Sequence, residues 1–110
     1  MNPNTPDNPP LSTDELRQKL NLETGKIEWP ELQRHFARGS VIVVDSQLDL
    51  IEVAVKFIRD DKSRIENWLN TGQIKRANDD HARHWHQADI IFWAVVIAPW
   101  VLVQEHSPAA

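Results

Sequence analysis

Apolar residues recur every three or four positions near the start of the chain, which is the spacing of one face of a helix. Leu16 and Leu20 lie on that face. Ser12 is expected to cap the helix, with Glu15 three residues later as its partner in a capping box. The pattern therefore predicts a helix from Ser12 to about Leu22.

A second helix is predicted from Trp29 to Arg38, because Pro30 suits a first helical turn and Gly39 suits a C-terminal stop. The β-branched run Ser40–Val44 comes next. Such a run, placed between a glycine and an aspartate, is typical of a short buried strand.

An amphipathic helix with only a narrow polar stripe is predicted in the middle of the chain, over residues 47–59. Asp45 or Ser46 is expected to be its N-cap, while Asp49 and Glu52 complement its dipole. Carboxylates gathered in this way also suit acid–base catalysis or magnesium binding. We favour the structural interpretation of Asp45, Asp49 and Glu52, because capping alone requires these residue types.

Two more helices and a second strand are predicted in the next part of the chain. The first helix begins at Asp60 or Asp61 and ends at Gly72, and the strand covers residues 73–77. The side chains expected to face inward are Ile65, Trp68 and Leu69 in the first helix, and Ala82 and Trp85 in the second.

The last predicted element is the uncharged run Ile90–Val103. It is too short to cross a membrane as a helix, which takes about 20 apolar residues. Its β-branched and aromatic content favours two strands joined by a bend at Pro99. The alternative is a helix that Asp89 caps and that ends before Pro99.

Together these elements predict a single α+β domain over residues 11–105. About five helices are expected to pack on a sheet of three to four strands that includes the C-terminal apolar segment. Residues 1–10 contain four prolines and are expected to form a disordered tail, and residues 106–110 a short one.

The composition narrows the classes of function. A formal net charge of −4 argues against nucleic acid and anionic lipid as partners. The chain has no cysteine, which removes disulfides and thiolate chemistry, and it shows no secretory signal, so a cytoplasmic location is expected. It also has no glycine-rich phosphate loop and no nucleophile elbow, so no cofactor is expected.

Three stretches, ARGSVIVVDSQLDLIEVA, ENWLNTGQIKRA and FWAVVIAPWVLVQE, resemble a bacterial family of unknown function that is numbered 2288. The resemblance covers about Glu15 to Glu105. It implies a small cytoplasmic bacterial protein, and it brings no catalytic residue, ligand or partner with it.

A histidine-rich segment offers candidate metal ligands. His81 and His84 share a face of the predicted helix, whereas His86 points away from them. A metal site at His81 and His84 would need a third ligand from elsewhere in the chain. We favour two exposed histidines on an ordinary amphipathic helix.

A candidate binding surface consists of Lys75, Arg76, Trp93 and Trp100. Basic side chains and aromatic rings together suit the binding of single-stranded nucleic acid. Acidic residues interleave with the bases of this region, which weakens that interpretation.

The function that we favour is a noncatalytic protein-interaction or self-association module, acting as a homodimer or with a protein partner. The apolar C-terminal segment and the five tryptophans favour it. One alternative is a small metal-dependent or acid–base enzyme that uses His81 and His84 or the Asp45 turn. A second alternative is a weak single-stranded nucleic-acid binder.

Overall fold

The computed structural model describes residues 11–106, and within that range it contains five helices and a five-stranded sheet. The α+β class is therefore confirmed. The tail expected at residues 1–10 and most of the tail expected at 106–110 lie outside the described residues. In chain order the elements are α1 (Thr13–Glu23), β1 (Gly25–Glu28), α2 (Trp29–Ala37), β2 (Val41–Val44), α3 (Leu50–Ile58), α4 (Lys62–Thr71), β3 (Ile74–Arg76), α5 (Asp79–Gln87), β4 (Ile91–Ile97) and β5 (Trp100–His106).

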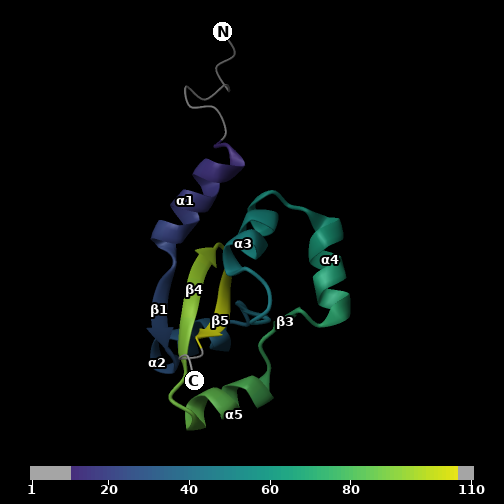
Figure 1. Cartoon of the computed structure of the whole chain (residues 1–110). Helices are drawn as coiled ribbons and strands as arrows, with labels where there is room; N and C mark the ends of the chain where they lie inside the picture. Colours follow the sequence, from purple (N-terminus) through teal and green to yellow (C-terminus); the bar gives the residue numbers. More distant parts are fainter. Residues whose placement is uncertain (1–10, 107–110) are drawn as a thin grey trace.

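The C-terminal apolar segment forms a hairpin in the centre of the sheet (Figure 1). Its strands β4 and β5 are antiparallel and pair from Ile97 with Trp100 at the turn to Ile91 with His106 at the open end. The turn contains Pro99, so the predicted strand pair is confirmed and the helical alternative is wrong. Both strands have a second neighbour in the sheet, and this pairing satisfies backbone groups that an isolated apolar run cannot.

The strand order is β1-β4-β5-β2-β3, with β2 parallel to β5 and every other neighbouring pair antiparallel. The sheet has one strand more than the upper number that we predicted. The additional strand is β1, which pairs with β4 from Gly25 opposite Ala94 to Glu28 opposite Ile91. Its sequence, Gly-Lys-Ile-Glu, carries only one apolar side chain, so its place in the sheet comes from pairing with β4.

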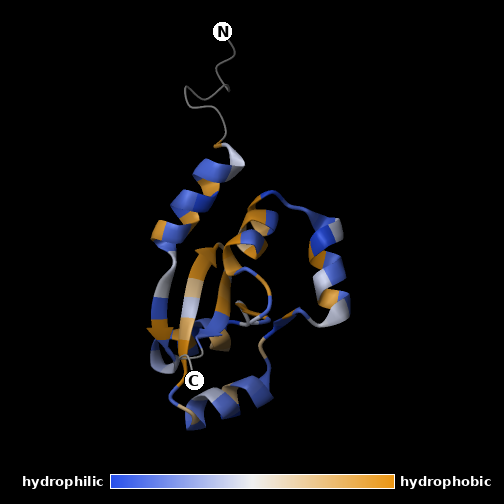
Figure 2. Ribbon diagram, in the orientation of Figure 1, coloured by the Kyte–Doolittle hydropathy of each residue, from blue (hydrophilic) through white to orange (hydrophobic). Residues whose placement is uncertain are grey.

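Helices cover both faces of the sheet, which divides the core into two clusters. Figure 2 shows hydrophobic residues along β4 and β5, and shorter hydrophobic bands on the helices around them. One cluster lies under α1, α3 and α4 and contains Leu16, Leu20, Val53, Trp68, Val95 and Leu102 among others. The other lies under α2 and α5 and contains Trp29, Leu32, Trp85, Phe92 and Val103 among others. Alternate side chains of β4 and β5 therefore point to opposite faces of the sheet, one set into each cluster.

At most helix ends, the residue that caps the helix is the one predicted from the sequence. Ser12 Oγ accepts a hydrogen bond from the Glu15 amide at 3.2 Å, and Glu15 Oε1 accepts one from the Ser12 amide at 3.1 Å. This is the predicted capping box, and the bond to the Ser12 amide lowers the pKa of Glu15. Asp61 caps α4, and Gly72 ends it with a positive φ of 76°, a backbone conformation that glycine adopts without strain.

The start of α3 differs from the prediction. The helix begins at Leu50 and is capped by Asp49, whose side chain accepts a hydrogen bond from the Ile51 amide at 2.9 Å. Asp45 and Ser46 do not cap it, because the chain first makes a turn in which Asp45 Oδ1 accepts from the Gln47 amide. The turn at Asp45 thus begins the connection, and the helix starts five residues after Asp45.

Gln104 of β5 holds this turn from the neighbouring strand. Its Nε2 donates to the carbonyl oxygen of Asp45 at 2.8 Å and to that of Leu48 at 2.7 Å. The side chain of Gln104, 56 or more positions away in sequence, therefore stabilises the turn that precedes α3.

Substituting Asp49 by alanine is expected to lower the free energy of unfolding by about 1 kcal/mol, because it removes the N-cap of α3. The matched variant Asp45→Ala should cost less, within about 0.5 kcal/mol, because Asp45 is exposed and caps no helix. Urea unfolding of both variants measures the difference. A larger loss for Asp45→Ala than for Asp49→Ala would contradict the position of the cap.

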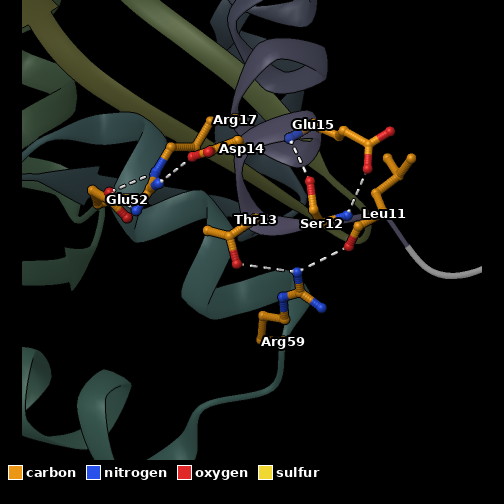
Figure 3. Close-up of polar contacts among 8 residues, drawn as sticks. All are labelled: Leu11, Ser12, Thr13, Asp14, Glu15, Arg17, Glu52 and Arg59. Carbon is orange, nitrogen blue, oxygen red and sulfur yellow. Dashed lines mark hydrogen bonds and ion pairs between the residues drawn. The ribbon is translucent and has the colours of Figure 1, made fainter.

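Two arginines join α1 to α3 (Figure 3). Nε of Arg17 donates to Glu52 Oε1 at 2.8 Å, and the same guanidinium pairs with Asp14 at 3.1 Å. The bond to Glu52 raises the pKa of Arg17. At the end of α3, Arg59 Nη2 donates to the carbonyl oxygen of Leu11 at 3.2 Å. Glu52 therefore has a tertiary role beside the predicted interaction with the helix dipole.

Candidate binding groove

An apolar groove of about 590 Å³ lies between α4 and the turn of the β4–β5 hairpin. This volume falls in the range of sites that bind small molecules or a few side chains. We call it the α4 groove. Its lining residues are Ile42, Phe57, Asp60, Lys62, Ile65, Glu66, Leu69, Ile74, Arg76, Ile97, Ala98, Pro99 and Trp100.

The groove exists because α4 packs at the side of the sheet. It contacts α3 and the edge strand β3, and Trp68 is the α4 residue that is buried in the core. Leu69 was predicted to face inward as well, and this is wrong: 48% of it is exposed. Since β3 is the last strand on that side, no neighbouring strand covers Leu69, and the side chain lines the groove instead.

Arg76 and Trp100 meet at the groove. The guanidinium carbon of Arg76 lies 5.1 Å from the centre of the Trp100 ring, which is the geometry of a cation–π interaction. Within residues 11–106, no carboxylate lies within ion-pair distance of Arg76. The cation is exposed and Trp100 is half-buried, so both side chains are accessible to a ligand.

The other two residues of the predicted binding surface lie elsewhere. Lys75 is next to Arg76 on a strand, so its side chain points to the opposite face of the sheet. Trp93 contacts Lys26, whose Nζ lies 5.0 Å from the ring centre, and its Nε1 donates to Nδ1 of His106 at 3.2 Å. The structure therefore brings together only Trp100 and Arg76 of the four predicted residues.

The polar groups of the α4 groove all lie at its rim. Asp60, Lys62, Glu66 and Arg76 are exposed, whereas Ile42 and Ile74 at the floor are buried. Among the described lining residues there is no histidine, serine or threonine to act as a base or nucleophile. The arrangement can receive apolar side chains and offers charges only at its border.

Of the two candidate metal ligands, His84 is exposed as expected, whereas His81 is half-buried and has structural partners. Nδ1 of His81 accepts a hydrogen bond from the Asn78 amide at 3.0 Å, which closes a capping box at the start of α5. The His81 ring stacks on Trp85 with 5.2 Å between the ring centres. Across residues 11–106 no three histidine, cysteine or acidic side chains gather in a way that could hold a metal ion.

His81 is expected to make stability depend on pH. Burial, and then the charge of Lys75, lower its pKa below the ordinary value, against the opposite effects of Glu105 and Asp80. The unfolded chain therefore binds the proton more readily than the native state. The stabilisation from neutral His81 is present above the unfolded pKa of about 6.5 and is lost as the pH falls below it.

The variant His81→Gln tests this. Glutamine keeps an acceptor for the Asn78 amide but does not titrate, so the fall in melting temperature from pH 7 to pH 5 should be smaller than in the wild type. The remaining histidines are the same in both proteins, so the comparison isolates His81. An equal fall in the two would show that His81 is not responsible.

Sequence reasoning missed most of the groove. Ile65 and Leu69 were recognised as one apolar face, but the pattern does not say whether another element covers that face. Ile97 and Pro99 were assigned to the hairpin, and nothing in their local sequence indicates that α4 leaves them in contact with a groove.

The fold is that of a small α+β domain with a mixed sheet and helices on both faces. Within residues 11–106, no helix is both long enough and apolar enough to span a membrane. The chain belongs to the family described as "Protein of unknown function (DUF2288)", whose model matches residues 15–105. The family resemblance of the sequence is thereby confirmed.

A solved structure supports the fold independently. The chain is similar to PA1075 from Pseudomonas aeruginosa, known from an NMR solution structure, with 43% sequence identity and a TM-score of 0.76. The similarity covers 86% of this chain and 88% of that one. No curated protein matches the chain. The relative is bacterial, in agreement with the expected origin.

Proposed function

We propose that this protein is a noncatalytic interaction module that receives apolar side chains of a partner protein in the α4 groove. The observation that carries the proposal is the uncovered apolar floor between α4 and the hairpin turn, where the polar side chains of the lining are all exposed. Removing such a surface from water is favourable, at roughly 25 cal/mol for each Å² of apolar area.

The residue types at the groove support this function. Aromatic and arginine side chains are enriched among the residues that contribute most to binding at protein interfaces, and Trp100 and Arg76 lie here side by side. Leu69 and Ile65 from α4, with Ile97 from the hairpin, add aliphatic surface around them. A central apolar area with a charged rim is the usual composition of an interface.

A photo-crosslinking experiment in the source bacterium tests the proposal. A photoreactive phenylalanine analogue at Lys62, on the rim, should give a discrete crosslinked protein. The variant Leu69→Glu should abolish that product, because it places a charge in the apolar groove, and Leu69 is exposed enough for the fold to tolerate it. An adduct with twice the mass of the chain would identify a second copy as the partner.

The matched control places the same analogue at Leu22, which lies on α1 and is 87% exposed. It should give no specific product. Equal crosslinking from Leu22 and Lys62, or a product that persists with Leu69→Glu, would contradict the groove as the binding site.

A further inference from the structure

We propose that the partner segment is an apolar peptide that carries a carboxylate, and that this carboxylate binds Arg76. The inference rests on the proposed function, because it names the chemistry of the partner at the same groove. Three observations support it: Arg76 lies on one wall of the groove, its side chain stacks on Trp100, and the polar side chains of the lining are exposed.

Arg76 is suited to bind an anion. Its guanidinium lies 5.1 Å from the centre of the Trp100 ring, and no described carboxylate is within ion-pair distance. Arginine presents a planar set of donors that can hold a carboxylate through two parallel hydrogen bonds. Stacking on Trp100 restricts the side chain before binding, which reduces the entropy lost when a ligand is held.

The other charged groups of the groove lie on its other wall. Lys62 and Glu66 are one helical turn apart on the same side of α4, and Asp60 precedes that helix. The wall formed by the sheet carries Arg76 among Ile42, Ile74 and Trp100. A ligand with one negative charge on the sheet side and apolar groups elsewhere therefore complements the groove.

A peptide matches the groove better than a small molecule does. Sites for small molecules enclose most of the ligand and orient it with polar groups that converge inside the pocket. Here the polar lining groups, Asp60, Lys62, Glu66 and Arg76, are all exposed at the rim. A peptide can fix its position through several apolar side chains on the floor and one carboxylate at the border.

Two pools of synthetic hexapeptides test the inference. Both have Leu, Ile, Val or Phe at four positions, with blocked ends. One pool carries Glu and the other Gln at the fifth position, and both carry Gln at the sixth, so that the pools differ by one carboxylate. Each is titrated into the ¹⁵N-labelled full chain by NMR, and the indole N–H signal of Trp100 is identified with Trp100→Phe. We expect both pools to shift that signal, with the Glu pool binding about tenfold more tightly, as expected for one charge-assisted pair.

Two variants at neighbouring positions test whether Arg76 is the residue that binds the carboxylate. In Arg76→Gln the preference for the Glu pool should disappear while binding of the Gln pool remains. Lys75→Gln, which removes a charge from the opposite face of the same strand, should keep the preference. Higher salt should reduce the preference, since an exposed ion pair is screened.

The outcomes distinguish the proposed function, an interaction site in the α4 groove, from the inference that a carboxylate of the partner binds Arg76. Equal affinity of the two pools for the wild type would overturn the carboxylate inference and leave the groove as an interaction site. No shift of Trp100 with either pool at millimolar concentration would overturn both. If octanoate binds as tightly as the Glu pool, the occupant is a small apolar acid and the peptide assignment is wrong.

Discussion

Replacing Trp85 by alanine is expected to lower the free energy of unfolding by about 3–5 kcal/mol, the usual cost of removing a large aromatic side chain from a core. Trp85 is 1% exposed and lies between α5 and the sheet. Its ring meets Phe92 edge to face at 4.9 Å and lies 5.7 Å from Trp29. Its Nε1 also donates to Glu105 at 3.1 Å, so the substitution removes a polar partner as well.

The matched control is Trp100→Ala. The Trp100 ring is half-buried and lines the α4 groove, so its removal leaves no closed cavity and should cost much less stability. Guanidinium unfolding, followed by far-ultraviolet circular dichroism because a tryptophan signal is lost, measures both. A loss for Trp100→Ala as large as that for Trp85→Ala would mean that Trp100 belongs to the core and not to a binding surface.

Leu102→Ala is expected to lower the free energy of unfolding by about 2–5 kcal/mol. Leu102 lies on β5, has no exposed surface, and pairs with Val95 of β4 on one side and Ile42 of β2 on the other. Leu102 lies in the core cluster on the face of the sheet where α3 packs on β5. A cavity at this position cannot close by a small movement, because the sheet fixes the backbone on both sides.

Val96→Ala provides the control within the same hairpin. Val96 is 62% exposed, so truncating it should change stability by less than about 1 kcal/mol. Thermal unfolding of the two variants tests whether burial, and not merely membership of the apolar segment, decides the cost. Similar losses at the two positions would argue that the hairpin is packed differently from the arrangement described above.

Local sequence signals were sufficient wherever neighbours along the chain decide the structure. The capping box of Ser12 and Glu15 and the stop at Gly72 depend on groups only a few residues apart. The strand Val41–Val44 and the hairpin around Pro99 follow from β-branched runs and a proline. These elements could be predicted because their determinants are local.

Elements that depend on distant partners were missed or displaced. The strand Gly25–Glu28 has a polar sequence and exists through its pairing with β4. The start of α3 moved from residue 47 to Leu50, with Gln104 of β5 bonded to the carbonyl groups of the preceding turn. The pairing of β1 with β4 and the bonds of Gln104 both join residues that are far apart in sequence.

The candidate site shows the same division. The sequence offered Lys75, Arg76, Trp93 and Trp100 as one surface, because all four residue types suit binding. Alternation along β3 separates Lys75 from Arg76, and Trp93 packs with Lys26 instead. The contact between Arg76 and Trp100 joins residues on β3 and β5, with β2 between them, so it depends on the strand order.

By itself the sequence determined the α+β class, the apolar hairpin that forms the centre of the sheet, and most helix boundaries, because periodicity, capping and β-propensity act over a few residues. The tertiary structure alone decided the strand order, which faces of the helices are covered, and hence where an apolar groove remains. Those properties depend on which distant segments meet. The groove exists because α4 packs against α3 and the edge strand β3 in a way that leaves Leu69 of α4 exposed.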